Sequence, residues 1–99
     1  MADIGSHPSR YLAEVYTPRR ELDQLEAKAD RIRVATEAVA AGGVSIRHLQ
    51  VVFVPEEETC FYLFDAPNAD SVEQVLRGAA VEAERISAAF DPGRSLRLP

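Results

Sequence analysis

The spacing of apolar residues changes twice along the first half of the chain, and this change restricts the fold more than any other feature. From Arg20 to about Ala41, apolar residues recur every three or four positions, as on one stripe of a long helix. On either side, over residues 10–16 and 44–54, they alternate or run together as in β-strands. A strand, a helix and a second strand are therefore expected in this order.

Proline and glycine mark the ends of these segments. Thr17-Pro18 closes the first strand, because proline restricts the residue before it and cannot donate to a strand ladder. Gly42-Gly43 ends the helix, since glycine tolerates the left-handed conformation found at many helix ends. Residues 55–58, PEEE, form a charged turn, so residues 59–64 are expected to pair with the second strand in a hairpin.

The second half completes a known arrangement. Asn68 or Asp70 is expected to cap a second helix that runs to about Ala80. Residues 83–90 fit a last strand and are equally compatible with helix. With the strand, the order is β-α-β-β-α-β. This is the ferredoxin-like α+β fold, a four-stranded antiparallel sheet with two helices on one face and the first strand beside the third.

The length of the chain suggests one domain, with a short segment outside it at each end. The 99 residues fit a single domain, which is expected over residues 9–90. Residues 1–6 read like a translated cloning linker, residues 1–8 are set aside as a leader, and residues 91–99 are expected to be a flexible tail.

Composition excludes several classes of partner. The net charge is −5 and basic residues do not cluster, which argues against a nucleic acid. No apolar run approaches the roughly 20 residues that span a bilayer, so a membrane partner is not expected. The single Cys60 suits a reducing, cytoplasmic location, and because no basic residue neighbours it to lower its pKa, we expect it to be structural.

Strand alternation predicts which residues line the sheet face that the helices leave uncovered. In residues 44–54, Leu49, Val51 and Phe53 are uniformly large and apolar and are expected to face the helices. The polar residues expected on the uncovered face are then Glu14, Tyr16, His48 and Gln50. The apolar residues expected there are Leu12, Ile46 and Val52. Such an apolar share predicts a homodimer through this face, which would enclose a cavity.

The segments RYLAEVYTP, VSIRHLQVVFVPEEETCFYLFDAPNADSVEQV and AERI resemble a family of small actinobacterial ferredoxin-like domains that includes a nickel-binding protein. That family is often described only as a domain of unknown function. Its motifs fall on Glu14, His48 and residues 65–67. The resemblance implies a homodimer, a dimeric α+β barrel, and non-catalytic binding of nickel or a similar divalent ion by His48 and Glu14.

The chain departs from the family pattern at three positions. Tyr62 stands where the family usually has cysteine, Val75 where it often has histidine, and Asp65 where it usually has glutamate. Imidazole and thiolate are the donors that suit nickel and zinc, so these departures predict a weaker site for such ions.

Two other functions stay open. The chain is also compatible with a cofactor-independent enzyme, such as a cyclase, isomerase or monooxygenase, or with a protein that binds a small molecule in the dimer cavity. His48 would then be the general acid or base, with Glu14 orienting it. The residues expected to hydrogen-bond the ligand are Tyr16, Gln50 and Tyr62. An interaction module without small-molecule chemistry is the third alternative.

Overall fold

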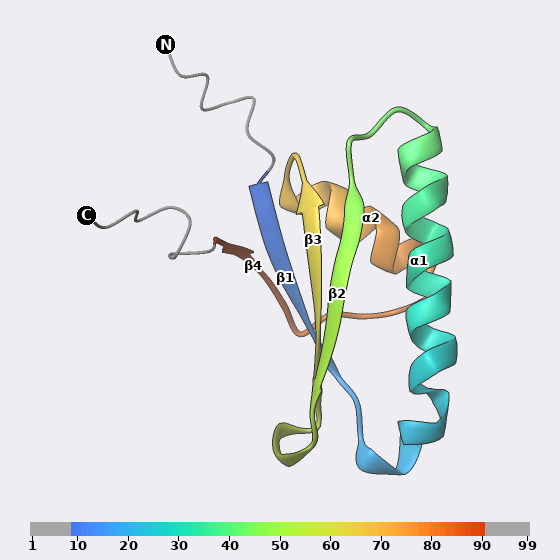
Figure 1. Ribbon diagram of the computed structural model, residues 1–99, viewed down its shortest axis with the longest axis vertical. Coiled ribbons are helices and arrows are strands. Elements are labelled where there is room, and N and C mark those ends of the chain that lie inside the picture. Colours follow the sequence, from blue (N-terminus) through green and yellow to red (C-terminus); the bar gives the residue numbers. More distant parts are fainter. Residues whose placement is uncertain (1–8, 91–99) are drawn as a thin grey trace, which may run out of the picture.

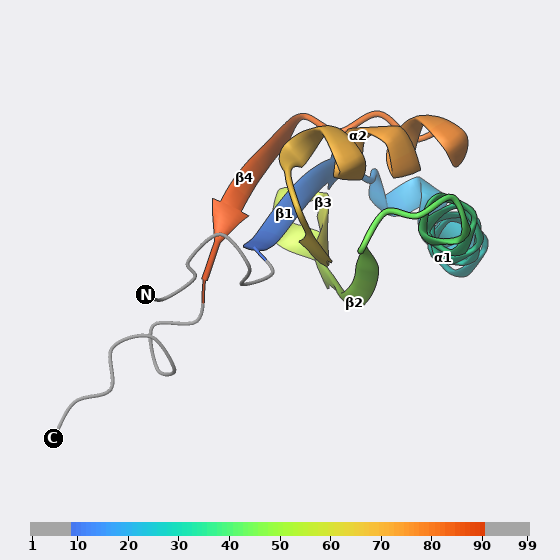
Figure 2. The same cartoon turned by 90° about the horizontal axis from the view of Figure 1, so that it is seen from above.

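The computed structural model describes residues 9–90, and the predicted leader and tail lie outside them. Its elements are β1 (Ser9–Tyr16), η2 (Arg19–Gln24), α1 (Leu25–Ala41), β2 (Arg47–Val54), η3 (Pro55–Glu57), β3 (Thr59–Ala66), α2 (Ala69–Gly78) and β4 (Arg85–Ala89). Both helices lie on one side of the sheet and leave the other uncovered (Figures 1 and 2). The predicted ferredoxin-like order is confirmed, and the last element is a strand.

The four strands form one antiparallel sheet in the order β2-β3-β1-β4. The first strand is therefore central and lies beside the third, as expected. In β1, Ala13 lies opposite Tyr62 of β3 and Ile86 of β4. Directly opposed residues point to the same face of a sheet, so this register fixes which side chains meet the helices.

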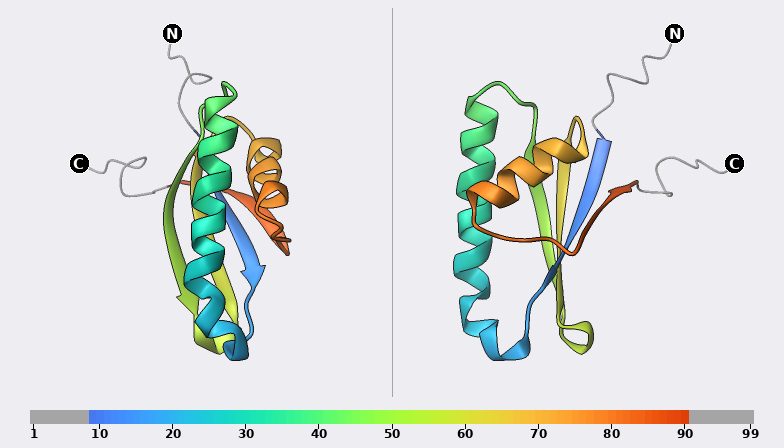
Figure 3. Two further views of the ribbon diagram at one scale, coloured as in Figure 1. Left: turned by 90° about the vertical axis from the view of Figure 1, so that its right-hand side faces the viewer. Right: turned by 180° about the vertical axis from the view of Figure 1, so that it is seen from behind.

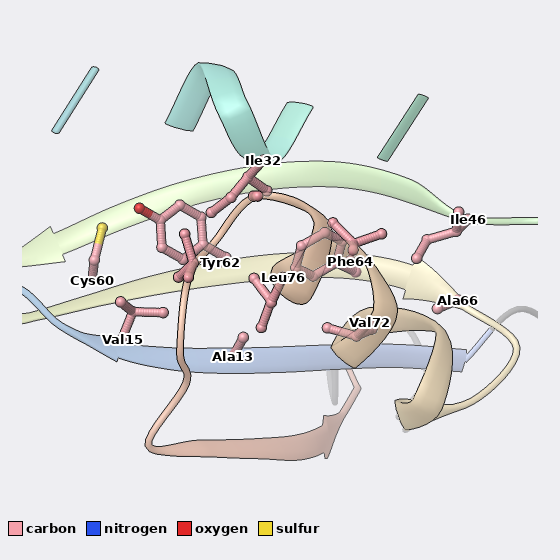
Figure 4. Packing of buried hydrophobic residues seen from close by; sticks show 13 residues of the cluster. Ala13, Val15, Ile32, Ile46, Cys60, Tyr62, Phe64, Ala66, Val72 and Leu76 are labelled. Carbon is pink, nitrogen blue, oxygen red and sulfur yellow. The ribbon is translucent and has the colours of Figure 1, made fainter. Parts of the chain in front are cut away.

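The core fills the space between the sheet and the two helices (Figure 4). α1 runs alongside β2, whereas α2 lies obliquely across the upper part of the sheet (Figure 3). The buried apolar residues are Ala13, Val15, Ile32, Ile46, Cys60, Tyr62, Phe64, Ala66, Val72, Val75, Leu76, Ala79 and Val81. Alternate residues of β1 and β3 supply six of these thirteen, so the two central strands form the sheet side of the core.

The helix ends follow the local sequence. The Asn68 side chain caps α2, because its Oδ1 accepts hydrogen bonds from the Ser71 backbone N–H (2.9 Å) and hydroxyl (2.7 Å). Gly43, with φ 109°, follows the end of α1 in the left-handed region that glycine tolerates. The expected single helix from Arg20 is interrupted. Glu21 has non-helical angles (φ −107°, ψ 17°), and the regular α-helix starts only at Leu25.

A β-bulge in β2 changes the face of its first half. His48 lies opposite Phe64 and Gln50 lies opposite Leu63, so Leu49 is an extra residue in the ladder. Residues 46 and 48 therefore face the helices before the bulge, and residues 51 and 53 face them after it. The expected uncovered position of Ile46 and His48 is wrong, because uninterrupted alternation does not hold across a bulge. Ile46 is 4% exposed.

Among residues 9–90, neither helix combines the length and the apolar composition needed to cross a bilayer.

Candidate functional site

The sheet separates the predicted site residues into two groups. Glu14 and Tyr16 alternate with the helix-facing Ala13 and Val15, and Gln50 lies opposite Leu63, so these three point to the uncovered face as expected. His48 and Tyr62 point to the helix-covered face. The predicted pairing of His48 with Glu14, as metal ligands or as acid and orienting base, is therefore not formed within one protomer.

His48 is part of the core lining. Its ring centroid lies 5.1 Å from that of Phe64 and 5.9 Å from that of Tyr62. The Nε2 atom is buried and has no hydrogen-bond partner among the described residues. Burial lowers the pKa of His48, because it disfavours the charged imidazolium, and a hydrogen bond with the Gln50 backbone opposes this only in part. At neutral pH the ring is therefore uncharged.

A crevice of about 230 Å³ opens beside His48 between α1 and β2. The residues that line it are Arg33, Thr36, Glu37, Ala40, Ile46, Arg47 and His48. Glu37 is the one carboxylate in this lining, and it is ion-paired with Arg33 at 3.1 Å. Within residues 9–90, no three or more His, Cys, Asp or Glu side chains are grouped as metal ligands. The ligand set implied by the family resemblance therefore does not fit a single protomer.

Cys60 and Tyr62 form a buried pair on β3. Both are completely buried, and the Tyr62 hydroxyl points toward the Cys60 end of the strand (Figure 4). Burial raises the pKa of the Cys60 thiol and of the Tyr62 phenol, because the core disfavours the ionised form of each group. A buried thiol is consistent with the predicted structural role of Cys60. Tyr62, which was expected to hydrogen-bond a ligand in the dimer cavity, packs under the helices and does not reach the uncovered face of this protomer.

The uncovered face, which we call the open face, has an apolar centre. Its partly buried apolar side chains are Leu12, Val54, Phe61 and Leu63, and Val52 is 44% exposed. A carboxylate interrupts this surface: Glu14 Oε2 accepts a hydrogen bond from Arg85 Nε at 3.0 Å. The Glu14 side chain is 22% exposed and that of Arg85 is 68% exposed. The sequence pattern missed Arg85, because only the β1–β4 register brings it opposite Glu14.

A second charged group lies at the end of the open face where β1 begins. The Asp65 carboxylate accepts hydrogen bonds from Arg10 Nε at 3.1 Å and from Arg47 at 2.9 Å. The Asp65 side chain is 10% exposed, so two guanidinium groups from the neighbouring strands cover it. The strand register places the three side chains in a row across β1, β3 and β2.

A larger surface hollow lies elsewhere. It has a volume of about 820 Å³, lies between α1 and α2, and is lined by four alanines and by larger side chains that include Val34, Arg31 and Arg77. None of the site residues predicted from the sequence lines it.

Comparison with known proteins supports the architecture. No model of a known protein family matches the chain, and no curated protein matches it either. Among solved structures, the crystal structure of SCO4226 from Streptomyces coelicolor A3(2) is similar, with a TM-score of 0.68 and 17% sequence identity. The match covers 81% of this chain and 94% of that one. At this identity the likeness shows a shared fold.

Proposed function

We propose that the protein is a cytoplasmic homodimer that binds a small molecule between its two open faces. One observation carries this proposal: a carboxylate, Glu14, is held among apolar side chains on a sheet face that no helix covers. An apolar face of this kind is stabilised by a partner surface, because contiguous exposed apolar area is rare on proteins that act as monomers. Two sheets packed face to face stack about 10 Å apart, with their side chains between them.

The chemistry of the open face defines the ligand class. Phe61, Leu63 and Leu12 supply apolar walls, and Glu14 and Gln50 supply hydrogen-bonding groups. A pocket of apolar walls with few polar groups suits a compact, largely apolar molecule with a hydroxyl or amide N–H that donates to the carboxylate. Arg85 Nε donates to Glu14 Oε2 and so holds the carboxylate in place.

Sedimentation equilibrium tests the dimer. The protein is expected to be dimeric at tens of micromolar, and Leu63→Asp is expected to shift it to monomer, because a charge would be buried in the interface. The matched control is Val34→Asp, on the exposed surface of α1, which is expected to leave the association unchanged. A monomeric wild-type protein at these concentrations contradicts the proposal.

A thermal-shift screen of small phenols and amides tests the ligand. Compounds that raise the melting temperature of the wild-type protein are expected to lose this effect in Glu14→Gln. They are expected to keep it in Glu73→Gln, which changes an exposed carboxylate on α2. Equal shifts in both variants would remove Glu14 from the proposed site.

Divalent-ion binding is a second proposal, favoured by the unpartnered His48 Nε2 and by Glu37 in the same crevice. Neutral imidazole suits nickel and related ions, and Glu37 would add an oxygen ligand. Native mass spectrometry with nickel is expected to show one ion per chain that is lost in His48→Gln and in Glu37→Gln. Ion binding that survives in both variants, or no binding by the wild-type protein, refutes this proposal.

A further inference from the structure

Charge is distributed unevenly along the open face. At the end where β1 begins, Arg10 and Arg47 flank the single carboxylate of Asp65, so cations exceed anions. The opposite end is the β2–β3 turn, at the bottom of Figure 1, which carries three consecutive glutamates. There Glu58 Oε2 accepts a hydrogen bond from the Arg19 backbone N–H at 2.9 Å, and Arg19 Nε donates to Pro55 O at 3.1 Å. One guanidinium therefore lies beside three carboxylates, of which Glu56 and Glu57 are exposed. The strands therefore run from a basic end to an acidic end.

Symmetry restricts how two copies can use this face. A two-fold axis makes every contact twice, so the surface must be complementary to itself. An axis along the strands would bring the two basic ends together and the two acidic turns together. An axis across the strands reverses their direction, so that the basic end of each copy meets the acidic turn of the other. Like charges brought together destabilise a dimer, whereas opposite charges stabilise it and steer association. The axis across the strands is therefore favoured.

The size of the face agrees with a protein partner of this kind. Three strands of eight residues and one of five, at about 3.3 Å per residue and spaced about 4.8 Å apart, give a flat area on the order of 450 Å². Side-chain relief makes the accessible area larger than the flat area. A specific interface needs about 1,000 Å² in total from the two partners. The open faces of two copies together reach this size.

We propose that the second copy of the chain packs on the open face with its strands antiparallel to those of the first, held in this orientation by Arg47 of each copy against Glu56 and Glu57 of the other. This inference rests on the homodimer proposed above and names its orientation. Arg47 is suited to this role because its side chain is 73% exposed even while it bonds Asp65. Pairs at the rim of an interface set orientation and association rate more than affinity.

Mixing wild-type protein with the variant Glu56→Arg/Glu57→Arg distinguishes the two axes. The changed residues are exposed and lie in the turn, so the fold is expected to survive. In the antiparallel dimer, the variant alone is expected to dimerise at least tenfold more weakly at low salt. The heterodimer of this variant with the wild type has one attractive and one repulsive contact. Its fraction among all dimers is expected not to exceed that of random pairing. With the axis along the strands, arginines would meet glutamates and the heterodimer would dominate, which would overturn the proposal.

A charge swap tests whether these charged groups meet across the interface, while the mixing experiment above distinguishes the axes, because the swap favours the heterodimer about either axis. Arg47→Glu mixed with Glu56→Arg/Glu57→Arg restores both contacts in the heterodimer only, so native mass spectrometry is expected to show it well above the statistical share. This excess is expected to fall in 1 M NaCl. If Arg47→Glu does not fold, Arg47→Gln replaces it, with a smaller excess expected. A statistical mixture refutes the orientation while the homodimer stands, and a monomeric wild-type protein refutes the homodimer itself.

Discussion

The two faces of the sheet differ in how far their side chains are exposed to solvent. On the helix-covered face, alternate residues of β3 such as Tyr62 and Phe64 are fully buried. On the open face, their immediate neighbours Phe61 and Leu63 remain partly exposed, and Val52 is 44% exposed. Both faces have an apolar centre, and the open face also carries the charged groups of Glu14 and Asp65 with their arginine partners. The helices supply packing partners on one side only. On the other side, a partner surface could still bury apolar side chains and gain free energy of association.

Both faces also contain polar exceptions. On the covered face, His48 Nε2 and the Tyr62 hydroxyl are buried without a hydrogen-bond partner among residues 9–90. On the open face, the most buried exception is Asp65, whose carboxylate has two arginine partners. A buried polar group without a partner costs stability, whereas a carboxylate with charged partners is stabilised. The covered face therefore holds the unsatisfied polar groups, and the Asp65 carboxylate of the open face is satisfied.

The largest expected difference is between the two phenylalanines of β3, Phe61 and Phe64, which point to opposite faces. Phe64→Ala is expected to cost about 3–5 kcal/mol of unfolding free energy, because it leaves a cavity under the helices. Phe61→Ala is expected to cost less than half as much in dilute solution, since its ring is already partly in water there. Urea denaturation at low and high protein concentration measures both, and equal costs at low concentration would contradict the comparison.

Asp65→Asn tests the polar exception of the open face. The loss of charge from a group with two guanidinium partners is expected to cost about 1.5–3 kcal/mol. The matched control is Asp30→Asn, since Asp30 is 67% exposed and ion-paired with Arg33 within one helix. Thermal unfolding at neutral pH is expected to show a clear loss for the first variant and little change for the second. A loss of the same size in both would mean that burial of the open-face carboxylate is unimportant.

The pH dependence of stability tests His48 on the covered face. The pKa of folded His48 lies below its ordinary value near 6.5, so the unfolded chain binds more protons in this range. Stability is then full above pH 6.5 and is lost as the pH falls through the lowered pKa. Between pH 7 and pH 5, the wild-type protein is expected to lose stability more steeply than His48→Leu, whatever the absolute stability of that variant. Parallel curves from chemical denaturation would contradict the burial of the imidazole.

The smallest expected effect is that of Val52→Thr on the open face. Exposed substitutions usually change stability by no more than about 0.5 kcal/mol, and this one is expected to weaken dimerisation while leaving the isolated fold almost unchanged. Val51→Thr, one residue earlier and facing the helices, is expected to destabilise more, because it brings a hydroxyl toward the core. Chemical denaturation of both variants under dilute conditions measures the difference, and the reverse order would mean that the register of β2 is wrong.

The candidate site was predictable only where strand alternation is uninterrupted. β1 is regular, so Glu14 and Tyr16 lie on the face that the sequence predicts. β2 contains the bulge at Leu49, so His48 lies on the other face although Gln50 is where it was expected. Tyr62 was expected beside a ligand because of its phenol, but its position in the β3 register makes it a core residue.

The sequence by itself determined the order of the elements and most of their ends. Periodicity distinguishes helix from strand, and Pro18, Gly43 and Asn68 act on the backbone within a few residues of themselves. The tertiary structure decided which face each side chain of β2 occupies, and which cations hold Glu14 and Asp65. These properties depend on pairing between strands far apart in the chain. A shift of one residue in that pairing moves a side chain through the sheet, and local sequence patterns do not encode such a shift.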